Sequence, residues 1–203
     1  MLLLALLSLA AEPNPLPKDF VSLAEIPALN LQIGYATSLN FTGAPLPGYE
    51  KPGAWLRKEA AASLVRVQAA LLPTGYGLVI FDAYRPVRAS EAMIRWAQGT
   101  GHGDWLAAGF IARWSEHSKG AAVDLSLTRG TQPVDMGSGW DEFGPKAATT
   151  GVSGEALQKR QRLRAAKVAE GWLPYDKEWW HFRYPIPDLP YLDVGYGEVP
   201  GEE

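Results

Sequence analysis

Residues 115–128 read SEHSKGAAVDLSLT, and residues 121–128 within this stretch predict a strand. Here apolar residues alternate with polar residues, so a strand would turn one set to each side: Val123, Leu125 and Leu127 against Asp124, Ser126 and Thr128. Elsewhere, helical and strand patterns interleave without regular parallel crossover units. We therefore expect an α+β fold, with a small central antiparallel sheet flanked by helices.

The predicted helices and strands lie on both sides of this stretch. Residues 55–72 carry apolar residues at spacings of three and four, which predicts a helix that ends at Pro73 and Gly75. Ser90 is a candidate N-cap for a second helix to Gln98, and a third helix is expected over residues 153–170. Strands are expected at three further places: residues 29–33, 78–81 and 179–184.

Composition excludes several classes of protein. The 203 residues suit one domain, and 19 Lys and Arg against 22 Asp and Glu argue against a dedicated nucleic-acid binder. There is no cysteine, which excludes thiol catalysis, disulfides and cysteine-ligated zinc. Any metal site must therefore use carboxylates and the three histidines.

Residues 1–11 read MLLLALLSLAA and resemble the apolar region of a secretory signal. The run is too short for a membrane span, which needs about 20 residues. Small residues at Ser8, Ala10 and Ala11 would suit cleavage. We expect export to the periplasm or cell envelope, with a cytoplasmic location as the alternative, and a single domain over residues 12–203.

His117, Asp124 and His181 are the candidate metal ligands. Two imidazoles and one carboxylate form a standard ligand set for catalytic zinc and leave a fourth position for water. Asp124 lies on the polar side of the predicted strand, and Gly120 allows the chain to bend between it and His117. Taken alone, each histidine could equally be a hydrogen-bonded core residue.

Glu178 lies three residues before His181 and is the candidate base. In a fully extended strand these two side chains would point to opposite faces. The hypothesis therefore requires a bend at Glu178, just before the strand begins.

Two patterns, S-x-H-x-x-G-x-A-x-D at residues 115–124 and E-x-W-H at 178–181, resemble the D-alanyl-D-alanine dipeptidases, the VanX-like zinc D,D-peptidases. That group is similar in fold to D,D-carboxypeptidases and to the zinc domain of hedgehog proteins. The turn DAYRP at 82–86 and MGSGWD at 136–141, with Trp140 in place of the usual Phe, extend the likeness. It covers residues 31–184 and implies a zinc site in a cleft on the sheet.

The resemblance also implies roles for individual residues. His117, Asp124 and His181 would bind one Zn²⁺ per chain, and Glu178 would be the general base. Arg85 would stabilise the oxyanion, although it could simply form a salt bridge with Asp82.

Three residues would bind the substrate. Asp141 would face its ammonium group, Ser115 would hydrogen-bond it, and Tyr35 would line the pocket. Asp135 is a competitor for the role of Asp141, and Tyr35 could equally be a core residue. Trp140 and Trp180 are expected to wall the site, and His102 is expected in a surface loop.

The implied activity is zinc-dependent hydrolysis of D-alanyl-D-alanine to two D-alanines, with water activated by Glu178. One alternative is a D,D- or L,D-carboxypeptidase that acts on cell-wall peptides. Another is a non-catalytic zinc-binding module, although such a module would need neither Glu178 nor Arg85. The expected partner is a small dipeptide rather than a nucleic acid.

Overall fold

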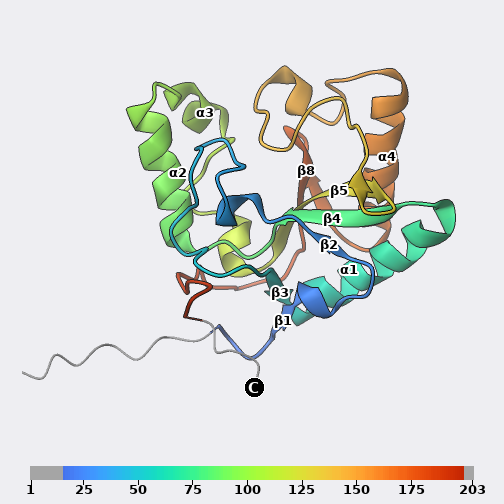
Figure 1. Ribbon diagram of the computed structural model, residues 1–203, viewed down its shortest axis with the longest axis horizontal. Helices are drawn as coiled ribbons and strands as arrows, with labels where there is room; N and C mark the ends of the chain where they lie inside the picture. Colours follow the sequence, from blue (N-terminus) through green and yellow to red (C-terminus); the bar gives the residue numbers. More distant parts are fainter. Residues whose placement is uncertain (1–15, 199–203) are drawn as a thin grey trace, which may run out of the picture.

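The computed structural model describes residues 16–198, so the signal-like segment at residues 1–11 lies outside the described residues. A six-stranded sheet runs through the molecule (Figure 1). Its strands, in spatial order, are β2 (Asn30–Leu31), β4 (Gly77–Asp82), β5 (Ala122–Arg129), β8 (Glu178–Arg183) and β7 (Leu173–Tyr175), with β6 (Gln132–Pro133) paired to the end of β5. All pairings are antiparallel except that of β2 with β4. The predicted α+β fold is confirmed, with a parallel strand at one edge.

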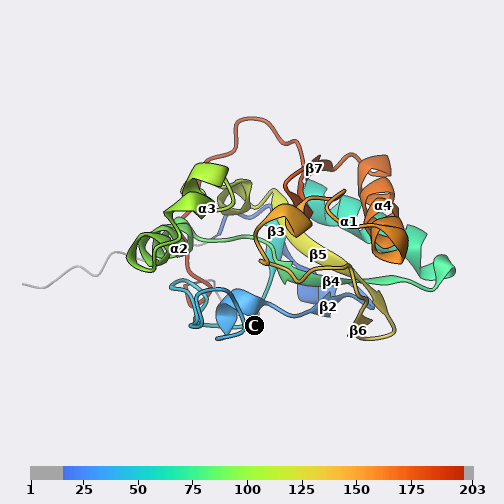
Figure 2. The ribbon, with the colours of Figure 1, turned by 90° about the horizontal axis from the view of Figure 1, so that it is seen from above.

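The helices lie in two places around this sheet. Helices α1 (Lys58–Leu71) and α4 (Gly154–Ala169) pack together against one face of the sheet, at one end of the molecule. Helices α2 (Val87–Gly99) and α3 (Gly103–Ala108) lie at the opposite end (Figures 1 and 2). A small second sheet pairs β1 (Phe20–Ser22) with β3 (Trp55–Arg57). Short 3₁₀ turns complete the chain: η1 (Leu23–Glu25), η2 (Gly34–Ala36), η3 (Leu72–Thr74), η4 (Glu116–Lys119) and η5 (Pro145–Ala147). Across residues 16–198, no helix combines the length and apolar character needed to cross a membrane.

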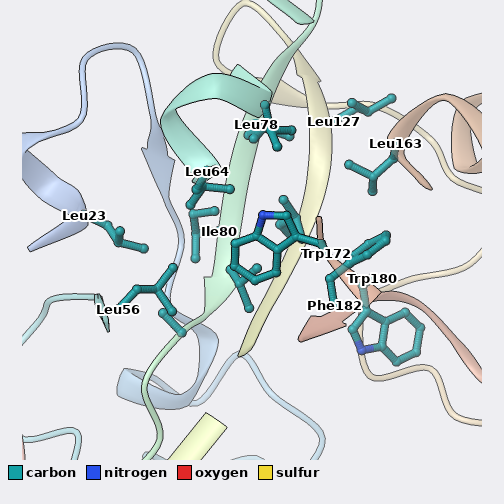
Figure 3. Close-up of a cluster of buried hydrophobic side chains, with 14 of the residues drawn as sticks. Leu23, Leu56, Leu64, Leu78, Ile80, Leu127, Leu163, Trp172, Trp180 and Phe182 are labelled. Atoms are coloured by element: carbon teal, nitrogen blue, oxygen red, sulfur yellow. The ribbon is translucent and has the colours of Figure 1, made fainter. Parts of the chain in front are cut away.

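The main hydrophobic core lies between the sheet and the pair α1 and α4. Leu64 of α1 and Leu163 of α4 meet apolar side chains of β4, β5 and β8, among them Leu78, Leu127 and Phe182 (Figure 3). All five side chains are almost completely buried. The alternation predicted for residues 121–128 is thus confirmed, because Val123, Leu125 and Leu127 all belong to this core.

Three predicted elements have different bounds in the structure. The helix expected from residue 55 begins at Lys58, because Trp55–Arg57 pairs with β1 as strand β3. Helix α2 begins at Val87 after Pro86, so Ser90 is a buried residue inside the helix rather than its N-cap. The strand expected over residues 29–33 is only two residues long. In the first case strand pairing overrode a boundary predicted from periodicity, and in the second a proline overrode a boundary predicted from a candidate N-cap.

Two irregularities in the sheet position polar residues. The register of β4 against β5 shifts between Ile80 and Asp82, so that Asp82 lies opposite Asp124. The register of β7 against β8 shifts between Pro174 and Tyr175, where β8 has extra residues between Glu178 and Phe182. Bulges of this kind redirect side chains. Here they bring carboxylates from three strands, Asp82, Asp124 and Glu178, to one end of the sheet.

Candidate active site

His117, Asp124 and His181 converge on one point. His117 Nε2 lies 3.2 Å from Asp124 Oδ1 and 3.1 Å from His181 Nδ1, and His181 Nδ1 lies 3.0 Å from the same Asp124 oxygen. Turn η4 carries His117, and Gly120, with φ +72°, closes this turn before β5 begins. Asp124 and His181 are direct partners in the pairing of β5 with β8. Local turn geometry and sheet register together therefore make the cluster.

The donor set of this cluster suits a divalent cation. His117 Nδ1 donates to the Ala83 carbonyl at 2.6 Å, which leaves the lone pair of Nε2 directed at the cluster. Burial lowers the pKa of His181 and keeps its imidazole neutral. Burial acts to raise the pKa of Asp124, but its contacts with His117 and His181 hold that pKa well below its usual value. The three ligand atoms lie within 4.8 Å of one another. They belong to two imidazoles and one ionised carboxylate, a set that could hold zinc.

Asp124 is held on both of its oxygens. Oδ1 faces the two imidazoles, whereas Oδ2 lies 3.4 Å from Arg85 Nη2 and accepts from Trp140 Nε1 at 3.4 Å. A ligating carboxylate that is itself hydrogen-bonded is typical of protein metal sites. Trp140, predicted to wall the site, therefore contacts the cluster through its indole N–H.

A cavity of about 240 Å³ opens beside the cluster, and Glu178 and His181 both line it. A Glu178 carboxylate oxygen lies 4.0 Å from His181 Nδ1. Burial raises the pKa of Glu178 well above its usual value. The expected bend before the strand was wrong, because Glu178 is the first residue of β8. The irregular pairing between Glu178 and Phe182 brings the two side chains to the same cavity instead.

Arg85 reaches the same cavity from the turn after β4. Its Nη2 lies 2.7 Å from Asp82 Oδ2, and its guanidinium lies 4.9 Å from the centre of the Tyr35 ring. Asp82 is fully buried and also accepts a hydrogen bond from Tyr49 at 2.5 Å. The salt bridge with Asp82 and a position at the cavity, which we treated as alternatives, therefore occur together.

Asp141 and Tyr35 form a second polar group in the cavity wall. The Tyr35 hydroxyl donates to Asp141 Oδ2 at 2.7 Å, and burial raises the pKa of Asp141 well above its usual value. The backbone of Asp141 has φ +59°, an uncommon conformation for a residue with a side chain. Asp135, the competitor, is exposed, is not among the lining residues of this cavity and accepts from the Gly137 amide. Tyr35 is both a buried core residue and a wall of the cavity.

Ser115 also lines the cavity, where its hydroxyl accepts from the His117 amide at 3.3 Å and caps η4. Trp180 forms part of the wall, as predicted. His102 is not among the cavity residues and stacks against both Trp96 and Trp105 just before α3.

Several cavity residues carry no motif and were not predicted. They include Phe41, Met93, Phe110, Phe143, Tyr175 and Arg183. Among them only Arg183 had a usable indication in the sequence, because it lies two residues after His181 and so on the same side of a strand. Met93 reaches the cavity from α2, Tyr175 from β7, and the others from loops.

Comparisons with known proteins agree with this geometry. Residues 17–196 match the model of the D-ala-D-ala dipeptidase family. The D-alanyl-D-alanine dipeptidase of Enterococcus faecium is 35% identical over 174 residues, covering 77% of this chain and 85% of the relative. That of Escherichia coli K12 is 33% identical over 171 residues, covering 82% and 85%.

Among solved structures, an LD-carboxypeptidase, LdcB, is similar with a TM-score of 0.50 at 21% identity. The match covers 91% of this chain and 72% of that chain, and it supports the fold alone. The family match over nearly the whole chain, together with a histidine and aspartate cluster suited to zinc, leads to one conclusion. The chain belongs to the D-ala-D-ala dipeptidase family and is a zinc peptidase.

Proposed function

We propose that this protein hydrolyses D-alanyl-D-alanine to two D-alanines. One observation carries the proposal: His117, Asp124 and His181 share a cavity of about 240 Å³ with Glu178, Arg85 and Asp141. This small cavity holds a ligand set for the metal, a base, a cation for developing negative charge and an anion for a substrate ammonium. The names of the two relatives above support the same substrate.

His117, Asp124 and His181 would hold the zinc ion. Bound there, zinc would lower the pKa of water toward about 7 and polarise the scissile carbonyl. Glu178 takes the proton of the attacking water and returns it to the leaving amine. Its buried position suits this role, because a raised pKa makes the carboxylate a stronger base.

Arg85 stabilises the negative charge that develops on the carbonyl oxygen. Its guanidinium is held in place by Asp82, so it needs little reorganisation during the reaction. A fixed donor of this kind contributes about 3 kcal/mol to lowering a barrier.

Asp141 binds the free ammonium of the dipeptide, and Tyr35 orients Asp141 through the hydrogen bond to Oδ2. Ser115 offers its hydroxyl proton to the substrate, since its oxygen already accepts from the His117 amide. A carboxylate that requires a free N-terminus explains why the enzyme would act on dipeptides rather than on longer chains.

The test is D-alanine release from D-alanyl-D-alanine by the purified protein, with and without a chelator. We expect release that the chelator abolishes and added zinc restores. Asp141→Ala should lose most activity on the dipeptide, whereas Asp135→Ala, outside the cavity, should keep it. Activity on N-terminally extended peptides that Asp141→Ala leaves unchanged would identify a carboxypeptidase instead. Zinc binding without cleavage of any D,D-peptide would identify a non-catalytic module.

We also propose that residues 12–203 form the mature single catalytic domain and that residues 1–11 direct export to the periplasm or cell envelope. The apolar sequence of residues 1–11 supports this proposal. Mass spectrometry of the mature protein should find an N-terminus near residue 12 in the exported fraction. An intact Met1 in a purely cytoplasmic protein would contradict it.

A further inference from the structure

Arg183 is a cation at the cavity that the proposed mechanism does not use. It lies on β8 two residues after His181, and side chains two residues apart on a strand point to the same side. The strand pairing also places these two side chains on the same side of the sheet, because His181 pairs with Asp124 and Arg183 pairs with Ala122, two residues earlier on β5. Arg183 lines the cavity together with His181.

The neighbours of Arg183 leave its guanidinium free. Its partners in the sheet are Ala122 on β5 and Leu173 on β7, whose side chains cannot form hydrogen bonds. Within residues 16–198, the Arg183 side chain makes no hydrogen bond and no ion pair. Its five N–H donors therefore have no protein acceptor.

The other charged groups of the cavity wall are unsuited to a substrate carboxylate. Arg85 is held by Asp82, and Glu116 is paired with Lys119 at 2.8 Å. Asp141 and Glu178 are acidic and would repel a carboxylate. A dipeptide has a negative C-terminus as well as a positive N-terminus, and the proposed mechanism leaves that C-terminus without a cation.

We infer that Arg183 binds the C-terminal carboxylate of the dipeptide, an inference that rests on the proposed function. A guanidinium can accept a carboxylate in a two-pronged hydrogen bond, which fixes its orientation as well as its position. The spacing is suitable, because residues two apart on a strand are about 6.5–7 Å apart and a dipeptide spans at most about 7 Å. When the scissile carbonyl lies beside His181, the C-terminal carboxylate of the dipeptide is therefore within reach of Arg183, and its N-terminal ammonium binds Asp141.

The experiment compares D-alanyl-D-alanine with its C-terminal amide, which lacks the negative charge. The wild type should prefer the acid in kcat/KM, and Arg183→Ala should remove that preference. For the acid, Arg183→Ala should raise KM about 10-fold or more, the usual effect of losing a hydrogen bond to a charged group, with kcat much less affected. For the amide, the two proteins should differ by less than about twofold. Arg183→Lys should recover part of the preference, because it keeps the charge but not the planar fork.

Arg113→Ala is the matched control, since Arg113 is exposed, follows the cavity residue Ala112 and already pairs with Glu91 at 2.6 Å. It should leave the preference for the acid unchanged. Calorimetric binding of the dipeptide to Glu178→Gln and to Glu178→Gln with Arg183→Ala gives a second readout that needs no turnover. We expect binding to weaken about 10-fold in the double variant.

If the ratio of kcat/KM for the acid to kcat/KM for the amide is the same in Arg183→Ala as in the wild type, the inference is overturned and the proposed function stands. A wild type that releases no D-alanine from the dipeptide would overturn the proposed function and the inference together. A loss of preference in Arg113→Ala as large as in Arg183→Ala would show a general charge effect and would also overturn it.

Discussion

The two faces of strand β5 are equally buried but differ in chemistry and in role. Val123, Leu125 and Leu127 are 0% exposed and pack beneath α1 and α4, whereas Asp124, Ser126 and Thr128 are 1–2% exposed on the opposite side. Burial of the apolar face stabilises the fold, at about 25 cal/mol per Å² of surface removed from water. Burial of the polar face has a cost, because each polar group loses water. One strand thus contributes stability on one side and chemistry on the other.

The cost of burying polar groups is visible around this polar face, in Asp82 on the neighbouring strand β4, in Glu178 on β8 and in Ser126 on β5 itself. Burial raises the pKa values of Asp82 and Glu178, which means that their ionised forms are disfavoured where they lie. The Ser126 hydroxyl has no hydrogen-bond partner within the described part of the chain. The comparison therefore predicts that changes on the polar face alter activity more than stability, and that changes on the apolar face do the reverse.

The largest effect is expected for a metal ligand. His117→Ala should reduce zinc content to near zero and dipeptide hydrolysis to background, because two remaining ligands hold zinc weakly. Metal analysis and far-UV circular dichroism of the purified protein would measure zinc and fold together. His102→Ala, which removes a histidine stacked against two tryptophans away from the cluster, should keep both zinc and activity.

A smaller loss of activity is expected for the base. Glu178→Gln should reduce kcat by about 10²–10⁴-fold, the usual contribution of general acid–base catalysis, while the zinc content stays at one per chain. Stopped or coupled assays of D-alanine give kcat, and metal analysis gives the zinc content. Glu116→Gln, in the same cavity wall but paired with Lys119, should lose far less. Equal losses in the two variants would contradict the assignment of Glu178.

The apolar face should show the opposite behaviour. Leu125→Ala should reduce the free energy of unfolding by about 2–5 kcal/mol through the lost burial and the cavity left behind. The KM for the dipeptide should stay close to that of the wild type in conditions where the variant is folded. Urea unfolding gives the first quantity and steady-state kinetics the second. Ser126→Ala, the adjacent residue on the polar face, should change stability by less than about 1 kcal/mol, because its hydroxyl has no partner to lose.

The smallest effect is expected at a buried lysine, Lys167 of α4. Lys167 is fully buried, its Nζ lies 3.0 Å from the centre of the Trp172 ring, and burial lowers its pKa well below the usual value. Between this lowered pKa and about pH 10.4, the unfolded chain binds more protons at this site than the folded protein, so the stability of the wild type rises with pH in that range. Lys167→Met should remove this slope and increase the free energy of unfolding at pH 7, because burial disfavours the charged ammonium.

Urea unfolding of Lys167→Met at pH 7 and above pH 10 checks the sign, since the gain should shrink as the pH approaches the unfolded pKa. Lys58→Met on the exposed side of α1 is the control and should show no such pH dependence. If the increase in the free energy of unfolding caused by Lys167→Met grows with pH, the pKa of Lys167 is not lowered in the folded protein.

Local patterns in the sequence predicted much of the fold, and the motifs included the two histidines and the aspartate that the structure brings together. The alternation over residues 121–128 decided which side chains of β5 face the core, because a strand turns successive residues to opposite sides. The spacing of His117, Gly120 and Asp124 was sufficient to predict their convergence, because a turn closed by a glycine spans only a few residues. The start of α1 was misplaced by three residues, because pairing with β1 outweighs helical periodicity, and the N-cap of α2 by four, because Pro86 rather than Ser90 precedes its first turn.

Tertiary structure alone decided how these local pieces meet. The shift at Ile80 sets Asp82 opposite Asp124, and the pairing of β5 with β8 sets Asp124 opposite His181. The irregular pairing of β7 with β8 brings Glu178 to the side of His181, and an apolar pair of neighbours leaves Arg183 free at the cavity. Each of these depends on contacts between residues far apart in the chain. The sequence determined which side chains were available, and the packing of distant strands determined which of them meet.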